Sequence, residues 1–303
     1  MIKNIEYLFH GTFTQDGAGV KLKRIFGGHE SAKLTDPFLL LDHFGSNKIE
    51  DYIAGFPWHP HRGIETITYL LEGKVEHEDS EGHKGTIYPS DIQWMTAGSG
   101  IFHQEMPKPL DDKDKKELLR TTGMPNSVVG MQLWLNMPTS KKMSVPTYRD
   151  FKGNMLPVID NGNGATVKVV AGNYFGTEGL LEENPLKTSY FDILMEDEST
   201  FELSIENGLN SMVYVIAGHI TSESGTKETL VAGDLGVFSR DGDSVVLSTN
   251  GSKARVIFLA GKPLNEPIYW YGPIVMNSRE QIDEALLDLR NNTFVKVKEP
   301  NFL

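Results

Sequence analysis

Cysteine, long apolar runs and an excess of basic residues are all missing from this chain. Because none of the 303 residues is cysteine, disulfide bonds and thiolate ligands are excluded, and any metal must bind through nitrogen or oxygen. No apolar run approaches the roughly 20 residues that span a bilayer. The first residues, Met1 to Glu6, also lack the apolar stretch of a signal peptide. We therefore expect a cytoplasmic protein with no membrane association.

The charge balance of the chain is acidic. Asp and Glu number 41 against 29 Lys and Arg, which gives a formal net charge of -12. Binding to nucleic-acid phosphates requires basic patches, so we expect no direct contact with nucleic acid. The hydrophobic fraction of 39% is ordinary for a globular protein that buries a core.

Short segments rich in β-branched and aromatic residues recur between glycines and prolines. Examples are 65–71, 167–170, 213–216, 244–247 and 254–259. Many short strands separated by regular turn signals are typical of β-sandwiches and β-barrels. The sequence therefore predicts an all-β fold.

One helix is predicted near the end of the chain. Ser278 and Gln281 have the spacing of a capping box. The apolar residues that follow lie at helical spacing: Ile282, Ala285, Leu286 and Leu289. We expect this helix to pack on the outside of a barrel.

A weak internal repeat indicates two copies of one barrel. Gly73 and Gly218, which lie 145 positions apart, each follow a strand-like segment. Asp91 and Asp234, which lie 143 positions apart, each precede the next strand-like segment. The segment from Pro138 to Pro157 is predicted to cross between the copies. The expected domains are residues 1–138, which carry the metal, and residues 139–303, a degenerate barrel without metal.

Two triplets have the spacing of a metal site, His59-Pro60-His61 and His103-Gln104-Glu105. Residues i and i+2 of a strand point to the same face, so each triplet directs two ligands the same way. If the strands are neighbours, the four groups converge. Imidazole and carboxylate without sulfur suit Fe, Mn, Ni, Cu or Zn. In an octahedral shell, two positions would stay open for water, substrate or dioxygen.

The same histidines and carboxylates also have ordinary structural interpretations. A single His-x-His pair is often exposed or hydrogen-bonded, whereas two pairs about 40 residues apart favour a metal site. Glu65 has the same parity as His61 and is a rival carboxylate: a ligand, an anchor for an imidazole, or a buried hydrogen-bonded group. Spacing alone leaves this open. His77 and His83 are expected to be exposed or satisfied by hydrogen bonds.

Long stretches of the chain resemble the pirin family. Residues 55–73 resemble the first cupin motif in its pirin form, and residues 85–107 resemble the second. The resemblance extends to residues 36–42, 131–138 and 272–277.

The resemblance implies a bicupin, two jelly-roll barrels with one iron ion in the N-terminal barrel. It implies metal ligands at His59, His61, His103 and Glu105, and none at Glu65. The segment from Leu110 to Val129 looks longer than is usual in the family, so it could reshape the mouth of the pocket.

The C-terminal copy lacks the imidazoles of the first. Carrying the 145-residue offset forward, His59, His61 and Glu65 correspond to Ser204, Glu206 and Asn210. We therefore expect this half to be structural.

The resemblance implies a quercetin 2,3-dioxygenase-like enzyme that opens a flavonol-like aromatic substrate with dioxygen. Glu105 would be both a ligand and the general base for the 3-hydroxyl proton. Iron is the expected metal, with Zn, Ni, Mn or Cu as alternatives. One alternative function is a non-enzymatic, iron-dependent redox regulator that binds a transcription factor or a metabolic enzyme. Another is a scaffold that the metal only stabilises.

Overall fold

The chain folds into two compact units, each built from separated segments. The computed structural model describes residues 1–117, 126–181 and 185–297. Unit 1 comprises Met1–Gly11, Glu30–Pro37 and Met155–Leu264. Unit 2 comprises Thr12–His29, Phe38–Asn154 and Asn265–Leu303. The expected domains, 1–138 and 139–303, divide the chain at a single boundary. In the structure, the long middle segment of unit 2 ends at residue 154, within the expected crossing, and the chain returns to unit 2 at residue 265.

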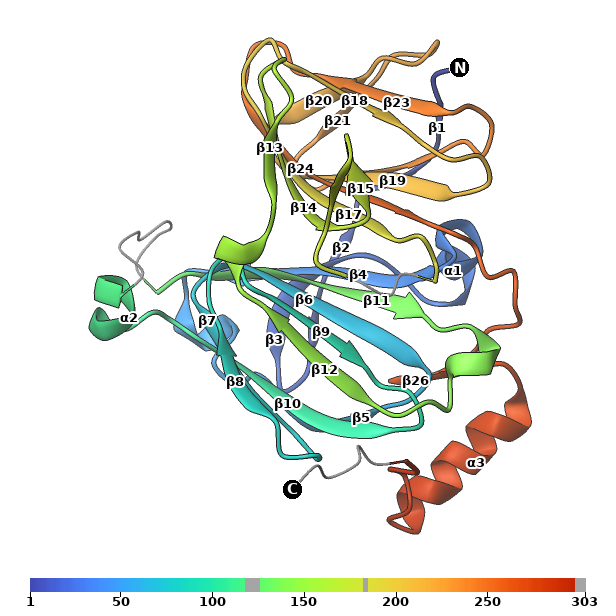
Figure 1. Ribbon diagram of the computed structural model, residues 1–303. Helices are drawn as coiled ribbons and strands as arrows, with labels where there is room; N and C mark the ends of the chain where they lie inside the picture. Colours follow the sequence, from blue (N-terminus) through green and yellow to red (C-terminus); the bar gives the residue numbers. More distant parts are fainter. Residues whose placement is uncertain (118–125, 182–184, 298–303) are drawn as a thin grey trace. The chain divides into compact units, whose positions relative to one another are not determined.

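Unit 2 is built around two large antiparallel sheets (Figure 1). One has seven strands in the order β12-β9-β6-β11-β4-β3-β2, and the other has four in the order β5-β10-β7-β8. The strands of the first are β2 Thr12–Asp16, β3 Val20–Gly27, β4 Phe38–Ser46, β6 Ile64–Glu72, β9 Ile92–Thr96, β11 Val128–Asn136 and β12 Thr147–Phe151. Those of the second are β5 Phe56–His61, β7 Lys74–Asp79, β8 Lys84–Ile87 and β10 Ile101–Lys108. Leu70 of β6 shares a core with Val75 of β7 and Ile87 of β8, so the two sheets face each other across that core.

Unit 1 repeats this plan around a large apolar core. Its seven-stranded sheet has the order β1-β22-β19-β24-β17-β14-β13, and its four-stranded sheet the order β18-β23-β20-β21. The strands are β1 Ile5–Phe9, β13 Val158–Asp160, β14 Ala165–Ala171, β17 Ser189–Met195, β18 Thr200–Ser204, β19 Asn210–Ala217, β20 His219–Ser222, β21 Glu228–Val231, β22 Leu235–Phe238, β23 Ser244–Ser248 and β24 Ala254–Gly261. A two-stranded ladder, β15 Asn173–Tyr174 and β16 Thr177–Glu178, completes the unit. Phe191, Phe201 and Phe258 lie in its core.

The predicted repeat corresponds to the same turns in both units. Gly73 and Gly218 follow β6 and β19 with φ of 79° and 75°. A Cβ on Gly218 would lie 2.1 Å from the carbonyl oxygen of Lys253, so only glycine fits there. Asp91 and Asp234 each accept a hydrogen bond from the backbone N–H three residues earlier, at 3.1 and 3.0 Å. The prediction of two all-β barrel halves is confirmed.

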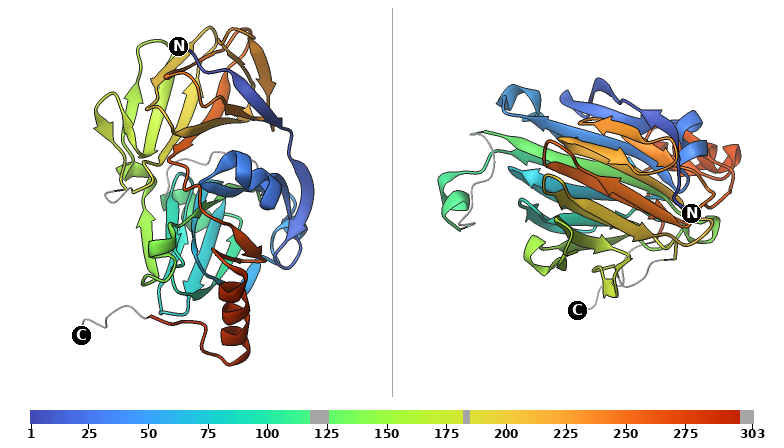
Figure 2. Two further views of the ribbon diagram at one scale, coloured as in Figure 1. Left: turned by 90° about the vertical axis from the view of Figure 1, so that its right-hand side faces the viewer. Right: turned by 90° about the horizontal axis from the view of Figure 1, so that it is seen from above.

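The predicted C-terminal helix is α3, Arg279–Arg290. The Ser278 side chain caps it by accepting from the backbone N–H of Gln281 at 3.3 Å. Gln281 in turn accepts from the backbone N–H of Asn277 at 2.9 Å. The helix follows the strand pair β25 Tyr269–Tyr271 and β26 Ile274–Met276 (Figure 2). Its apolar residues share a core with Phe102 of β10.

Within the described ranges, five short helices connect the strands. They are α1 His29–Thr35, α2 Asp112–Glu117, and the 3-10 turns η1 Ile49–Asp51, η2 Thr139–Lys141 and η3 Gly153–Met155. Residues 118–125 of the segment from Leu110 to Val129 lie outside the described residues, so its expected effect on the pocket mouth stays a prediction. Among the described residues, no helix has the length and apolar character needed to cross a membrane.

Candidate metal centre and ligand cleft

Antiparallel pairing of β5 with β10 brings the three predicted histidines together. His103 lies directly opposite His59, and Ile101 lies opposite His61. Because side chains alternate along each strand, the rings of His59, His61 and His103 extend from the same face of this strand pair. The convergence expected from the two triplets is therefore present for the imidazoles.

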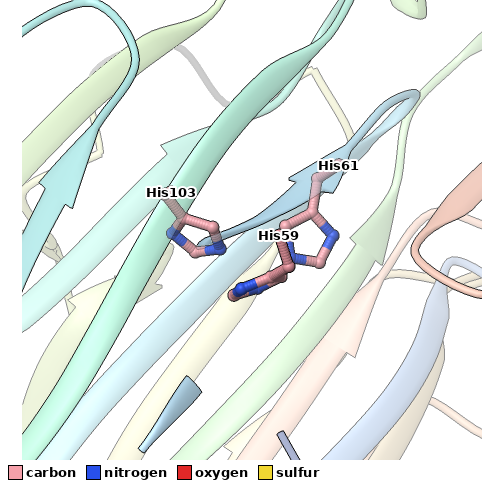
Figure 3. Close-up of side chains that lie close together, drawn as sticks. All are labelled: His59, His61 and His103. Atoms are coloured by element: carbon pink, nitrogen blue, oxygen red, sulfur yellow. The ribbon is translucent and has the colours of Figure 1, made fainter. Parts of the chain in front are cut away.

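The three rings form a compact cluster (Figure 3). One ring nitrogen of each lies within 4.8 Å of the others. Ring centroids are 4.3 Å apart for His59 and His103, 4.8 Å for His59 and His61, and 5.0 Å for His61 and His103. Burial, with the neighbouring imidazoles adding to it, lowers the pKa of His61 and His103 well below the usual value. Both rings are therefore neutral near pH 7 and offer a lone pair.

The hydrogen bonds of these rings fit a metal ion. His103 is fully buried, and neither ring nitrogen has a hydrogen-bond partner within the described part of the chain. Nδ1 of His59 donates to the carbonyl oxygen of Pro57 at 2.8 Å, and Nδ1 of His61 contacts that of Pro273 at 3.3 Å. With Nδ1 protonated, Nε2 of both rings is left as a ligand atom, the arrangement usual for metal-bound histidine. An all-nitrogen cluster suits a first-row transition metal.

Glu105 follows His103 by two residues on β10, but the cluster of ligand atoms does not include its carboxylate, which is held by other side chains. Oε1 accepts a hydrogen bond from Thr68 Oγ1, and Oε2 accepts one from Gln132 Nε2, both at 2.9 Å. The register between β10 and β5 shifts between His103 and Glu105, so the second triplet does not face β5 in a regular pattern. The role of Glu105 as the fourth ligand stays a prediction.

The rival carboxylate, Glu65, is a hydrogen-bonded group, as in one of the three alternatives that spacing left open, but its side chain is 20% exposed and not buried. It accepts hydrogen bonds from Trp94 Nε1 at 2.9 Å and Thr96 Oγ1 at 2.6 Å. Arg149 also pairs with it at 3.4 Å. The alternation of side chains along a strand does not continue from His61 to Glu65, because the two residues lie on different strands. Gly63, with φ of 78°, forms the turn that separates β5 from β6.

The expectation for His77 is wrong, whereas that for His83 is confirmed. His77 is 4% exposed, and neither ring nitrogen makes a hydrogen bond among the described residues, although Nε2 lies 3.4 Å from Asp150 Oδ2. It lies opposite Glu105 in the β7–β10 pairing and stacks on Tyr148 at 5.2 Å. Alternation along β7 therefore directs His77 into the barrel. His83 is hydrogen-bonded to Asp79 at 2.7 Å.

The C-terminal segment supports the strand that carries His61. Arg62 is buried, and its guanidinium donates to Asp288 of α3 at 3.0 Å and to the carbonyl oxygen of Phe294 at 2.6 Å. The same guanidinium lies 4.2 Å from the centre of the Phe294 ring. Sequence reasoning missed this support, because nothing in the local pattern links Arg62 to residues more than 200 positions away.

A buried lysine anchors the turn after His61. Lys142 Nζ donates to the carbonyl oxygens of Gly63 at 2.7 Å and Val275 at 2.9 Å, and to Asn136 Oδ1 at 2.6 Å. Burial lowers the pKa of Lys142 to about 7. This side chain therefore joins the His61 turn, β11 and β26.

A cleft of about 680 Å³ leads to the histidine cluster. Of the three rings, His59 lines it. Much of its wall is aromatic: Phe56, Trp58, Trp134 and Trp270. The Trp134 and Trp270 rings are 6.0 Å apart, and Trp134 meets His61 edge to face at 5.1 Å. The volume and the aromatic wall suit a flat organic ligand.

Comparison with known families identifies the fold. The pirin family model matches residues 19–135, and the model of the pirin C-terminal cupin domain matches residues 190–295. The chain belongs to the pirin family. Its two barrel halves are therefore those of a bicupin, and the two matched ranges fall on either side of the predicted boundary.

Relatives of this pirin are similar over nearly their whole length. A protein of Thermoplasma acidophilum, named provisionally as a quercetin 2,3-dioxygenase, is 45% identical over 85% of this chain and 98% of its own. A pirin-like protein of Caulobacter vibrioides is 39% identical over 97% and 99%. The crystal structure of a quercetin 2,3-dioxygenase from Acinetobacter baumannii matches with a TM-score of 0.85 and 29% identity, covering 97% and 99%.

Proposed function

We propose that this pirin is a metal-dependent quercetin 2,3-dioxygenase-like enzyme, which opens a flavonol with dioxygen and releases carbon monoxide. The observation that carries the proposal is the cluster of His59, His61 and His103 at an aromatic cleft. The names of the relatives from Thermoplasma and Acinetobacter support the same reaction.

The proposed ligands are His59, His61, His103 and Glu105, and the proposed metal is iron. When bound, the ion would supply Lewis-acid and redox chemistry for the reaction between flavonol and dioxygen. The neutral imidazoles His61 and His103 are ready to bind without first losing a proton.

Glu105 is the proposed general base for the 3-hydroxyl proton of the flavonol. Its carboxylate is buried, and hydrogen bonds from Thr68 and Gln132 fix its orientation. Of these residues, Gln132 also lines the cleft, so the carboxylate lies directly behind a side chain of the cleft wall. A base held this way can accept a proton in a defined direction.

The cleft walls would bind and orient the flat rings. Trp134 and Trp270 pack against each other and together form an aromatic surface on the cleft wall, against which a flat ring can lie. Covering this surface with ligand would exclude water from the histidine side of the cleft.

The test is oxygen uptake by iron-reconstituted protein with quercetin, with carbon monoxide measured in parallel. We expect uptake in the wild type and a loss of at least 100-fold in His61→Ala. His219→Ala, which changes a histidine of unit 1 outside the cluster, is the matched control and should keep full activity. No uptake with iron fully bound would contradict the proposal and favour a regulatory or structural metal.

A further inference from the structure

The floor of the cleft contains a row of polar side chains across three strands. Arg24 of β3 lies opposite Asp42 of β4, and Asp42 lies opposite Gln132 of β11. All three line the cleft, and Gln132 donates to Glu105. Neighbouring strands are about 4.8 Å apart, so Arg24 lies about 10 Å from Gln132 along the row. That distance is comparable to the length of a flavonol.

An apolar row runs beside the polar one. Gly27 of β3 lies opposite Leu40 of β4, and the next strand contributes Trp134, which lies opposite Leu40. These three residues also line the cleft. A Cβ on Gly27 would lie 3.2 Å from Arg24 Cδ and 3.4 Å from Leu40 Cδ1, so glycine keeps the floor flat at this point. A planar ring can therefore lie on the apolar row while its edge faces the polar row.

The far end of the polar row has two carboxylates and one guanidinium. Arg24 donates through Nε and Nη2 to Asp42 at 2.9 and 2.8 Å, and through Nη2 to Asp16 at 2.7 Å. The Asp42 side chain is 6% exposed, whereas that of Asp16 is 53% exposed and can accept further hydrogen bonds. Nη1 of Arg24 has no hydrogen-bond partner within the described ranges. At this end of the row, Asp16 can accept hydrogen bonds from ligand hydroxyls, and Nη1 of Arg24 can donate one to a ligand oxygen. Two carboxylates against one guanidinium leave a net negative charge, which disfavours ligands that carry a carboxylate.

The turn that carries Asp16 is attached to the strand that carries His59. The backbone N–H of Ala18 donates to the carbonyl oxygen of Gly55 at 3.0 Å, directly before β5. Gly17, with φ of 60°, packs so closely that a Cβ would lie 2.6 Å from the same oxygen. Asp16 therefore has a fixed position relative to the histidine cluster.

We propose that Asp16 and Arg24 form a subsite for two adjacent phenolic hydroxyls, the catechol group of a polyphenol. Asp16 accepts hydrogen bonds from the hydroxyls, and Nη1 of Arg24 donates to a hydroxyl oxygen. This inference rests on the proposed function for the placement of the remaining rings, and it narrows the substrate class to uncharged catechol-bearing flavonoids.

The test compares two flavones without a 3-hydroxyl, luteolin, which has a catechol ring, and chrysin, whose corresponding ring is unsubstituted. Binding to the full-length, iron-loaded protein is followed by tryptophan fluorescence. Two hydrogen bonds of about 0.7 kcal/mol each correspond to about tenfold tighter binding of luteolin. We expect this ratio to fall below about threefold in Asp16→Ala and to stay unchanged in Gln15→Ala, the control on the same strand. Arg24→Lys, which removes Nη1, should also lower the ratio and provides a second variant if Asp16→Ala does not fold.

Equal affinity for both flavones in the wild type would overturn the subsite. So would a ferric–catecholate absorption band on adding luteolin, because the catechol would then lie on the metal. Oxygen uptake with quercetin is measured separately, so the two proposals can fail independently. Luteolin preference without quercetin turnover refutes the dioxygenase and keeps the subsite, whereas turnover without preference refutes the subsite alone.

Discussion

Among single residues, His103 gives the strongest indication of a metal. Its side chain is fully buried, yet neither ring nitrogen has a hydrogen-bond partner in the described part of the chain. A buried polar group left unsatisfied costs about 1–3 kcal/mol. A metal ion bound to one nitrogen would offset this cost. Among the described residues, His77 is buried with the same lack of hydrogen bonds but lies outside the three-histidine cluster, so it is the convergence of His59 and His61 on His103 that indicates the metal.

The two rival carboxylates should respond differently to the same substitution. Glu65→Gln weakens charge-assisted hydrogen bonds from Trp94 and Thr96, so we expect a loss of about 1–3 kcal/mol in unfolding free energy with iron content unchanged. Glu105→Gln should lower iron content or affinity about tenfold or more. Urea denaturation and metal analysis of both variants test this. Iron loss in Glu65→Gln alone would reverse the two roles.

Lys142 should make stability depend on pH. Burial lowers its pKa to about 7, whereas lysine titrates near 10.5 in an unfolded chain. Between these values the unfolded chain binds more protons than the folded one, so the unfolding free energy rises with pH. We expect the stability of the wild type relative to Lys142→Met to increase from pH 7 to pH 9, measured by urea denaturation. A difference that stays flat over this range would contradict a lowered pKa.

At the scale of elements, helix α3 acts on the metal strand through one buried contact. Asp288 of α3 binds Arg62, which directly follows His61. The same carboxylate is bound by Lys296, which ties the end of the described chain to the helix. The helix therefore has a role beyond covering apolar surface, since it fixes the β5 strand end.

Asp288→Asn should weaken both the fold and the metal site. Removing one partner of a buried ion pair leaves an uncompensated charge, so we expect a loss of about 3–5 kcal/mol in unfolding free energy. Iron affinity should fall as well, because His61 loses its support. Asp283→Asn, an exposed position on the same helix, is the matched control. Unchanged iron affinity in a destabilised Asp288→Asn would confine α3 to a packing role.

At the scale of the whole molecule, metal binding should be visible in thermal stability. A ligand that binds only the folded chain stabilises it by about 2.7 kcal/mol at 100 times its Kd. For a unit of 150–250 residues this corresponds to about 5–10 °C. We therefore expect chelation of iron to lower the Tm of the wild type by this amount and to leave His103→Ala unchanged. Equal shifts in both proteins would contradict the histidine site.

The path of the chain between the units is the main feature that the sequence did not predict. Turn signals and strand patterns indicated two barrel copies, and their matched turns are present at Gly73 and Gly218. The return of residues 265–303 to unit 2 has no local signal. It depends on contacts such as that of Pro273 with His61, whose partners are far apart in the chain.

The sequence by itself determined the residue types of the site and the direction in which they point. Absence of cysteine limited any ligand to nitrogen or oxygen, and the i, i+2 spacing directed His59 and His61 to one face, because alternation is a property of a single strand. Tertiary structure decided which strands pair, so that Glu65 is bound by Trp94 and His77 is buried beside Glu105. It also formed the cleft from segments distant in sequence. Strand pairing depends on the summed packing of the whole core, which no local pattern contains.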